Sequence, residues 1–208
     1  MKNYFLSLFC LLFFGKIVFA QDDENKGGFR KENFFVGGSI SAAVANNVFG
    51  LGANPEFGYS IAKWIDAGIV ANYNYSSYRQ YYGADRLHQT IYGGGFYTRL
   101  FPVKFLFAQA QIEHNWIVQK QLFGSGGSEK DKFSSNSLLI GAGYTTGRDP
   151  RGRSGYGYFS ILFDVFQDAN SPYVTYDYDP NTNTNHARAV PIIRAGFIIP
   201  IFQGGRGR

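Results

Sequence analysis

From Phe34 onward, the chain repeats one pattern, in which apolar and polar side chains alternate along successive segments. Successive side chains of a β-strand point to opposite sides, so alternation with a period of two is typical of a strand whose faces meet different surroundings. Turn-forming residues separate these segments. The pattern predicts eight strands, placed at approximately 34–46, 49–63, 66–80, 87–101, 104–121, 134–147, 156–168 and 188–202.

The fifth segment shows the alternation most clearly. One face carries Phe107, Gln109, Gln111, Glu113, Asn115, Gln119 and Gln121, interrupted by Ile117. The other carries Leu106, Ala108, Ala110, Ile112, Trp116 and Val118, interrupted by His114. A helix would scatter both sets around its circumference, whereas a strand separates them.

The predicted connections differ in length. Those at 63–66 and 101–104 are tight, whereas 81–86, 123–132 and 169–187 form longer, polar loops. Short turns at one end and long loops at the other are typical of outer-membrane β-barrels. Two connections depart from this rule, because 46–47 is short and 148–155 is longer than a tight turn.

The N-terminus has the features of a secretory signal peptide. Lys2 is followed by an apolar stretch of about 11 residues, 4–14, which is too short for a spanning helix. We expect cleavage between Ala20 and Gln21, although an uncleaved anchor is the alternative. The predicted divisions are a signal peptide (1–20), a flexible periplasmic lead-in (21–33), the barrel (34–202) and a short tail (203–208).

Composition narrows the class of protein. The chain has 26 Gly, 21 Phe and 15 Tyr, which favours many strands over a helical bundle. Its single cysteine, Cys10, falls in the signal peptide, so the mature chain can form no disulfide and no thiol-ligated metal site. Loss of Lys2 and Lys16 lowers the formal charge from +5 to +3, and no basic stripe predicts nucleic-acid binding.

A soluble barrel and a membrane barrel share the same period, but the two faces favour a membrane. One face carries Gln, Glu, Asp, Asn and Arg, and the opposite face carries bulky aliphatic and aromatic residues. Tyr73, Tyr75 and Trp116 lie near predicted strand ends, where aromatic side chains form interfacial girdles. The sequence therefore predicts an all-β, eight-stranded, antiparallel, up-and-down transmembrane barrel.

With the polar faces inward, six charged residues enter the barrel interior: Glu56, Asp66, Arg99, Glu113, Asp164 and Arg194. Eight strands leave room only for side chains, and buried charges must be paired. We expect Arg99 to meet Glu113 or Glu56, and Arg194 to meet Asp164. These pairs predict a plugged interior; the alternative is an ion path that they gate.

Two stretches carry a family resemblance. The segment 54–68, NPEFGYSIAKWIDAG, and the segment 94–102, GGFYTRLFP, are similar to the second and fourth strands of OmpA/OmpX-like outer-membrane β-barrel proteins of the Bacteroidetes type. The resemblance covers about 34–202 and implies an architecture more than an activity. Members usually end on an aromatic residue that the assembly machinery recognises; Phe202 fits, but six further residues follow it.

No motif predicts catalysis, a cofactor or a metal site. His88, His114 and His186 form no zinc pattern, and His114, which faces lipid, is the only candidate for lipid A chemistry. Asp177, Asp179, Asn181, Asn183 and Asn185 offer oxygen ligands without an EF-hand pattern, so a solvated loop is the preferred interpretation. Gly93, Gly94 and Gly95 lie mid-strand, where they let bulky interior side chains pack closely. Arg148, Arg151 and Arg153 offer contacts to anionic lipid or periplasmic polymers, but a solubilising turn is the preferred interpretation.

We therefore expect a non-enzymatic outer-membrane protein with a periplasmic N-terminus, acting through its long loops in a structural or interaction role. Expected partners are outer-membrane lipids and lipopolysaccharide, the barrel assembly machinery and an unidentified protein at the loops. The alternatives are a narrow porin-like channel for small solutes or ions, an accessory subunit of a larger secretion or uptake complex, and, from a different class, a lipid-A-modifying enzyme.

Overall fold

The computed structural model describes residues 30–45, 48–79, 85–149, 154–179 and 184–202. All elements discussed below belong to one compact unit, Lys31–Arg208. A single turn of 3-10 helix, η1 (Lys31–Asn33), precedes the first strand. The strands are β1 (Phe34–Ala45), β2 (Val48–Ala62), β3 (Ile65–Arg79), β4 (Arg86–Val103), β5 (Leu106–Leu122), β6 (Ser128–Thr145), β7 (Tyr156–Asp164), β8 (Val174–Asp179), β9 (Thr184–Ala189) and β10 (Ile192–Pro200).

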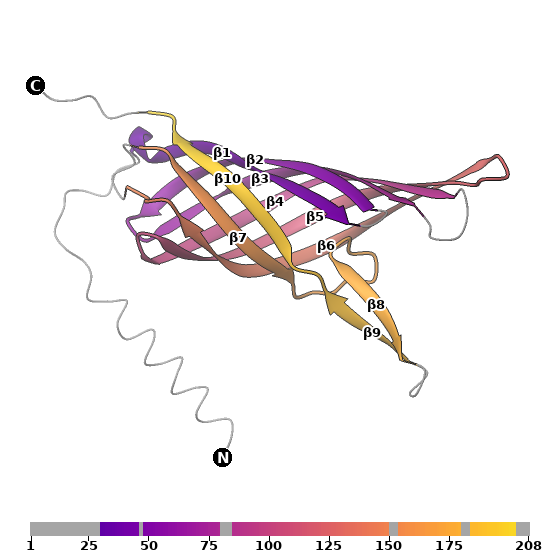
Figure 1. The fold of residues 1–208 in the computed structure, drawn as a ribbon. Coiled ribbons are helices and arrows are strands. Elements are labelled where there is room, and N and C mark those ends of the chain that lie inside the picture. The colour runs from indigo at the N-terminus through magenta and orange to yellow at the C-terminus, as the bar shows by residue number, and fades with distance from the viewer. Residues whose placement is uncertain (1–29, 46–47, 80–84, 150–153, 180–183, 203–208) are drawn as a thin grey trace, which may run out of the picture. The chain divides into compact units, whose positions relative to one another are not determined.

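Eight of these strands close into a barrel, in the order β1-β10-β7-β6-β5-β4-β3-β2. Every neighbouring pair is antiparallel, and β1 pairs with β10 to complete the ring. Figure 1 shows β1 beginning and β10 ending at the same end of the barrel. The prediction of eight antiparallel strands in an all-β domain is confirmed.

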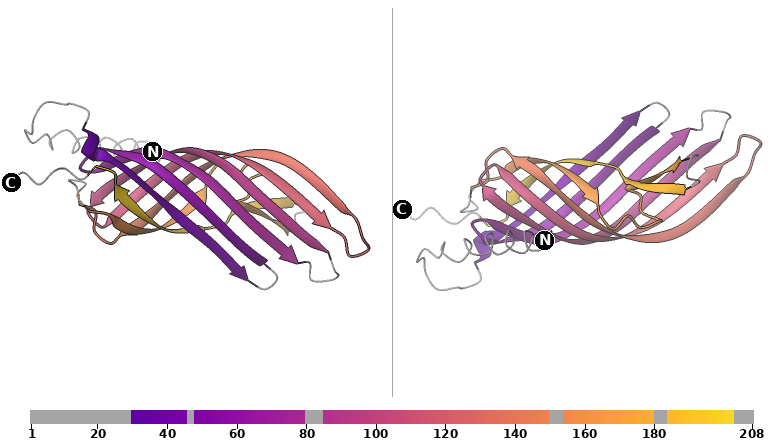
Figure 2. Two further views of the ribbon diagram at one scale, coloured as in Figure 1. Left: turned by 90° about the horizontal axis from the view of Figure 1, so that it is seen from above. Right: turned by 90° about the horizontal axis from the view of Figure 1, so that it is seen from below.

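The strands differ in length around the ring. β7 and β10 each have 9 residues, whereas β4 and β6 each have 18. The ladder between β6 and β7 begins only at Leu139, so the first part of β6 extends beyond the end of β7. In both views of Figure 2, the longer strands project past the ends of the shorter ones. The barrel wall is therefore taller on the side of β4, β5 and β6.

Several predicted boundaries are wrong. The sixth strand starts earlier than predicted, because its polar residues continue the strand beyond the apolar alternation. The predicted loop 123–132 is much shorter, because β6 starts at Ser128 and pairs with β5 along its whole length. In this part of β6, Glu129 and Asp131 alternate with Lys130 and Lys132, so the sign of the charge alternates in place of hydrophobicity. The seventh strand ends at residue 164 and the eighth barrel strand starts at 192, which makes both shorter than predicted.

The long connection between β7 and β10 contains a separate hairpin of β8 and β9, which the sequence pattern did not reveal. Asp177 and Asp179 lie on β8 and Asn185 lies on β9, so these candidate calcium ligands are strand residues. Asn181 and Asn183 lie outside the described residues. The last three residues of the predicted lead-in form η1, and the Asn33 side chain donates a hydrogen bond to the Ser60 carbonyl.

An aromatic cluster fills the interior near the end at which β1 begins. Its members come from six different strands: Phe35, Val70, Tyr97, Phe101, Phe107, Tyr156, Tyr158 and Ile198. Glycines make room for these rings, because a Cβ atom at Gly143 would lie 2.3 Å from Cζ of Phe107, and one at Gly58 would lie 2.3 Å from Cζ of Phe35. The interior at this end is therefore packed with side chains.

Candidate functional site: an apolar outer wall and a charged interior

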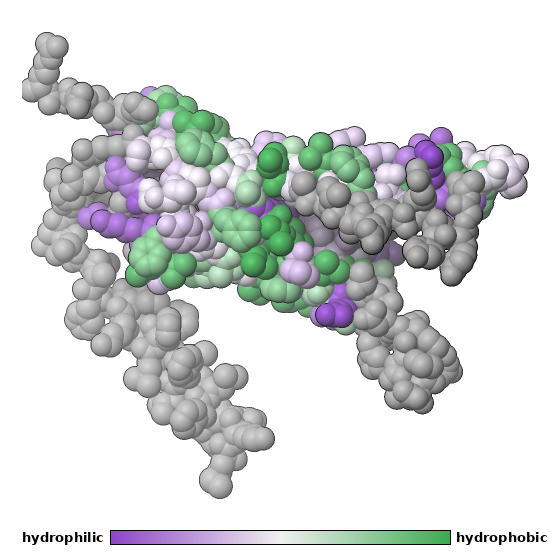
Figure 3. Space-filling model, in the orientation of Figure 1, coloured by the Kyte–Doolittle hydropathy of each residue, from purple (hydrophilic) through white to green (hydrophobic). Residues whose placement is uncertain are grey.

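The outer wall of the barrel is apolar. Outward-pointing side chains such as Phe96, Ile40 and Ile112 are 73%, 66% and 58% exposed, respectively. Figure 3 shows hydrophobic residues over much of the visible wall and strongly hydrophilic ones mainly near its two ends. A soluble protein seldom exposes apolar surface on this scale. No helix among the described residues has the length and hydropathy needed to cross a membrane.

Aromatic residues border this apolar wall. Tyr73, Tyr92 and Trp116 lie side by side in the register of β3, β4 and β5, and the rings of Tyr92 and Trp116 stack with centroids 5.9 Å apart. At the other end, Phe105 and Tyr144 form a second ring pair, 6.3 Å apart. Between these borders, no Lys, Arg, Asp or Glu occupies an outward position of the described barrel strands. Tyr75, the third predicted girdle residue, lies one outward position beyond Tyr73 and is half-buried.

The predicted charged residues lie inside, and all six are buried: Glu56, Asp66, Arg99, Glu113, Asp164 and Arg194. Arg99 forms an ion pair with Glu56, with Nη2 and Oε2 2.8 Å apart. The Arg99 Nε group donates a second bond to Gln109, at 2.9 Å. Tyr158 donates its hydroxyl to the other carboxylate oxygen of Glu56, at 2.8 Å. Of the two partners expected for Arg99, the structure places Glu56 beside it.

Aromatic rings surround this ion pair. The guanidinium carbon of Arg99 lies 4.6 Å from the ring centroid of Tyr97 and 4.5 Å from that of Tyr158. Cations are attracted to ring faces, and the attraction is larger where water is excluded. The arginine thus joins the charged interior to the aromatic cluster.

Asp66 pairs with Arg148, an arginine that the sequence placed in a solvated turn. Arg148 is 5% exposed, and its Nε and Nη2 groups donate to Asp66 at 3.2 and 2.5 Å. Arg148 also donates to the carbonyl oxygens of Lys63 and Ala62, and its guanidinium lies 4.4 Å from the Phe101 ring centroid. The expectation of a solubilising or lipid-contacting role is therefore wrong for Arg148. Arg151 and Arg153 lie outside the described residues.

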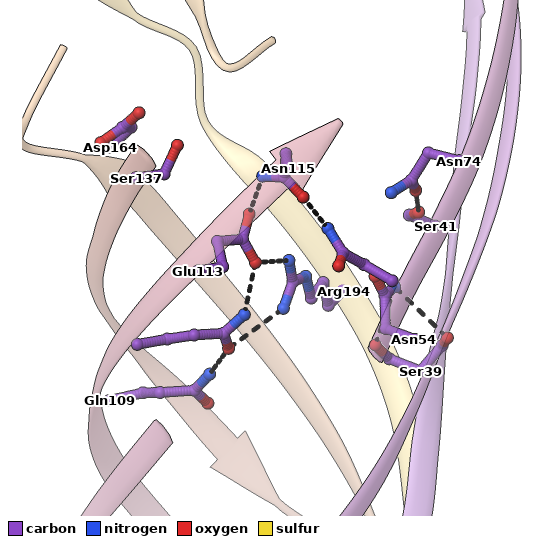
Figure 4. A network of polar contacts seen from close by, with 12 residues as sticks. Ser39, Ser41, Asn54, Asn74, Gln109, Glu113, Asn115, Ser137, Asp164 and Arg194 are labelled. Atoms are coloured by element: carbon purple, nitrogen blue, oxygen red, sulfur yellow. Dashed lines mark hydrogen bonds and ion pairs between the residues drawn. The ribbon is translucent and has the colours of Figure 1, made fainter. Parts of the chain in front are cut away.

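A ladder of polar side chains runs along the inner face of β5. Gln109 donates to Gln111 at 2.9 Å, and Gln111 and Asn115 donate to the two oxygens of Glu113 at 2.8 and 2.9 Å. Asn72 of β3 donates in turn to Asn115. Figure 4 shows this ladder, with Arg194 reaching it from β10.

Arg194 meets Glu113 and not Asp164, so the predicted Arg194–Asp164 pair is wrong. Nη2 of Arg194 lies 3.8 Å from Oε2 of Glu113, and Nη1 donates to Gln111 at 3.2 Å. In the register of β7 and β10, Arg194 stands opposite Ser160, and the last pair before the loop is Ile192 with Leu162. Asp164 therefore lies beyond the end of β10, out of line with Arg194.

Asp164 instead holds the loop that follows β7. Its carboxylate accepts bonds from the backbone amides of Leu138 and Phe166, at 3.2 and 3.1 Å, and from the Ser171 hydroxyl at 2.6 Å. Two residues on, the hydroxyl group of Tyr173 is buried. Burial and the negative charge of Glu113 raise the pKa of Tyr173 above its usual range, so this side chain stays neutral.

Among the remaining candidates, His114 and the glycine run lie within the described residues. His114 points outward, contacts the Trp116 ring edge-on and shares a hydrogen bond with Asn136. The described residues contain no group of three or more His, Cys, Asp or Glu side chains able to hold a metal ion. Gly93 and Gly95 sit mid-strand against β5, where an added Cβ would lie 2.2 and 1.9 Å from the carbonyl oxygens of His114 and Ile112. These glycines therefore allow a close approach of the β5 backbone, whereas the prediction had bulky interior side chains packing against them.

Comparisons with known proteins give no match, either to a protein-family model or to a curated sequence. The resemblance to OmpA/OmpX-like proteins therefore stays a prediction. Sequence reasoning missed Arg148, the Gln109–Gln111 ladder and the loop residues Ser171 and Tyr173. The alternation did predict that Gln109 and Gln111 point inward. Nothing in the pattern indicated that the turn with Arg148 or the loop with Ser171 would fold inward.

Proposed function

We propose that this protein is an integral outer-membrane β-barrel with a sealed interior, inserted after removal of an N-terminal signal peptide, and that it has a structural or interaction role. The single observation that carries the proposal is the inverted polarity of the barrel: charged and amide groups lie inside, and the wall between its aromatic borders carries no Lys, Arg, Asp or Glu at its outward positions. A closed barrel suits a lipid environment, because every strand finds both hydrogen-bonding neighbours and no edge faces lipid.

Strand length supports the membrane assignment. A transmembrane β-strand needs about 9–11 residues. The two shortest barrel strands, β7 and β10, have 9 residues each, and the 18 residues of β4 and β6 exceed the requirement. The extra length lies at the end of the barrel away from the start of β1 and the end of β10. In this proposal, that end is on the outer side of the membrane. The extended sheet and the β8–β9 hairpin then provide the surface for an interaction partner.

The interior favours a sealed barrel over a channel. The aromatic cluster fills one end, and the pairs Arg99–Glu56 and Arg148–Asp66 lie beside it. Further along, Arg194 reaches from β10 to the inner face of β5. Conduction would require several of these buried pairs to separate. Separation of a buried pair is costly, because it leaves each charge buried without its partner.

The experiment is refolding of the purified chain into lipid vesicles, followed by SDS gel migration with and without boiling. We expect a compact band that shifts on boiling, and planar bilayers containing the protein should show no stepwise conductance. Regular conductance steps would replace the sealed barrel with the channel alternative.

A pair of variants separates a membrane barrel from a soluble one. Phe96→Arg places a charge in the middle of the outer wall and should oppose insertion by about 2–4 kcal/mol. Ser128→Arg, the matched control, adds the same charge at an exposed position at the far end of β6. If both variants fold and stay soluble in buffer without lipid or detergent, the membrane assignment is wrong.

A further inference from the structure

Basic side chains gather on the outer face of β4, β5 and β6, just beyond the row formed by Tyr92 and Trp116. Arg86 and His88 come from β4, Lys120 from β5, and Lys130 and Lys132 from β6. All five have even residue numbers, as do the outward-pointing Tyr92 and Trp116 on the same strands. Because side chains alternate along a strand, these five point to the same side as the apolar wall. We call these five residues the basic cluster.

The strand register brings like charges together in this cluster. Lys120 pairs directly with Lys130 across β5 and β6, and with His88 across β5 and β4. Like charges directly opposite each other on one face of a sheet are destabilising. No Asp or Glu lies on this face of the three strands, since Glu129 and Asp131 occupy the opposite phase of β6. Among the described residues, the three lysines therefore lack a counterion.

An open hollow of about 370 Å3 lies within the cluster. It is lined by Tyr75, His88, Thr90, Val118, Lys120, Leu122 and Lys130. The hydroxyl group of Tyr75 bonds to Nδ1 of His88, which fixes the imidazole ring at the edge of the hollow. The lining thus combines cationic groups with the apolar side chains of Val118 and Leu122.

Protection of a sheet edge is a second explanation for lysines in such a place, because charged residues on an exposed edge strand discourage pairing with other chains. It accounts for Lys130 and Lys132, since this part of β6 extends beyond β7. It does not account for Lys120, which lies on β5 with β4 on one side and β6 on the other. An anion above the face explains all three lysines.

We propose that the basic cluster binds the phosphate groups of a phosphorylated lipid headgroup in the outer leaflet, with the acyl chains lying along the wall below. This inference rests on the proposed membrane location. The position supports a lipid over a free anion, because the apolar wall and the ring pair of Tyr92 and Trp116 begin immediately beside the lysines. Aromatic side chains take up positions at the headgroup level, and basic side chains there attract anionic lipids.

The test is native mass spectrometry of the full chain in detergent micelles, with bisphosphorylated lipid A as the probe. The variant K120Q/K130Q/K132Q should bind it about 100-fold more weakly than wild type. K31Q/K63Q/K104Q is the matched control, because it removes the same charge from the opposite end of the barrel. The control should bind lipid A as wild type does.

Two further probes identify the source of the phosphate. Dephosphorylated lipid A should bind wild type no better than it binds K120Q/K130Q/K132Q, and millimolar inorganic phosphate should not displace lipid A. Equal lipid A binding by wild type and K120Q/K130Q/K132Q would overturn the proposal, and so would strong displacement by inorganic phosphate, which would indicate a free-anion site.

A stability measurement keeps the test independent of binding detection. Without lipid A, K130Q should be at least as stable as wild type, since the change relieves repulsion with Lys120. With lipid A, wild type should gain more stability than K130Q, because a ligand stabilises the state that binds it. A chain that inserts into lipid, with a heat-shifted band, but binds lipid A no better than K120Q/K130Q/K132Q would refute this inference alone. A chain that never inserts into lipid would refute both this inference and the proposed function.

Discussion

The ion pair of Arg99 and Glu56 provides the sharpest test of the interior. Arg99→Met keeps much of the length of the side chain and removes its charge. The Glu56 carboxylate, only 2% exposed, then keeps the hydrogen bond from the Tyr158 hydroxyl but loses its ion pair. Removal of one member of a buried pair typically costs about 3–5 kcal/mol. Taking about 4 kcal/mol and a urea slope of about 2 kcal/mol/M, the unfolding midpoint should fall by about 2 M.

The assay is urea unfolding of the refolded barrel in detergent micelles, followed by loss of the heat-shifted band. Arg86→Met is the matched control, because it makes the same chemical change at an exposed position of the same strand. Its free energy of unfolding should change by less than about 0.5 kcal/mol. The double variant Glu56→Gln/Arg99→Met should recover most of the lost stability, since no buried charge is left alone. An unchanged midpoint for Arg99→Met would refute the plugged interior.

Three other changes test separate parts of the barrel by the same unfolding assay. Arg148→Gln should cost about 3–5 kcal/mol, because it leaves Asp66 buried and unpaired, whereas an arginine in a solvated turn would be replaced without effect. Gly143→Val should prevent or severely weaken folding, because its Cβ would meet the Phe107 ring at 2.3 Å; normal stability would show that the ring can move aside. Ser171→Ala should lower the free energy of unfolding by about 1.5–3 kcal/mol, because it removes a hydrogen bond to the charged Asp164. It should also speed proteolysis of the loop after β7. An unchanged cleavage rate would indicate that this bond does not hold the loop.

Much of the fold was predictable because the inside and outside of a barrel impose a period of two. The phase assigned to Gln109, Glu113 and Arg194 agrees with their burial, and the phase assigned to Trp116 agrees with its exposure. Strand ends were harder, because polar strands beyond the apolar wall have no hydrophobic alternation. The charge alternation of Glu129 and Lys130 is the signal that could have placed the start of β6.

The contacts inside the barrel were less predictable, because they depend on the stagger between strands and on segments that fold inward. Asp66 stands opposite Arg99 in the register of β3 and β4, yet Arg99 pairs with Glu56, and Asp66 pairs with Arg148 from a turn. The inward phase left two possible partners for Arg99 and did not indicate Arg148 as a partner for Asp66. The phase predicts which residues enter the interior, and the three-dimensional register decides which of them meet.

The central claim is that the apolar wall faces lipid, and the two tryptophans of the chain test it most directly. Trp64, in the turn between β2 and β3, and Trp116, on the outer face of β5, are 45% and 49% exposed and lie near opposite borders of the wall. The measurement is quenching of their fluorescence by lipids carrying bromine on the acyl chains, after reconstitution of the full chain into vesicles. We expect strong quenching, greater for bromine near the headgroup than for bromine near the chain end, and little quenching by acrylamide in water. Strong acrylamide quenching without any effect of brominated lipid would contradict the account.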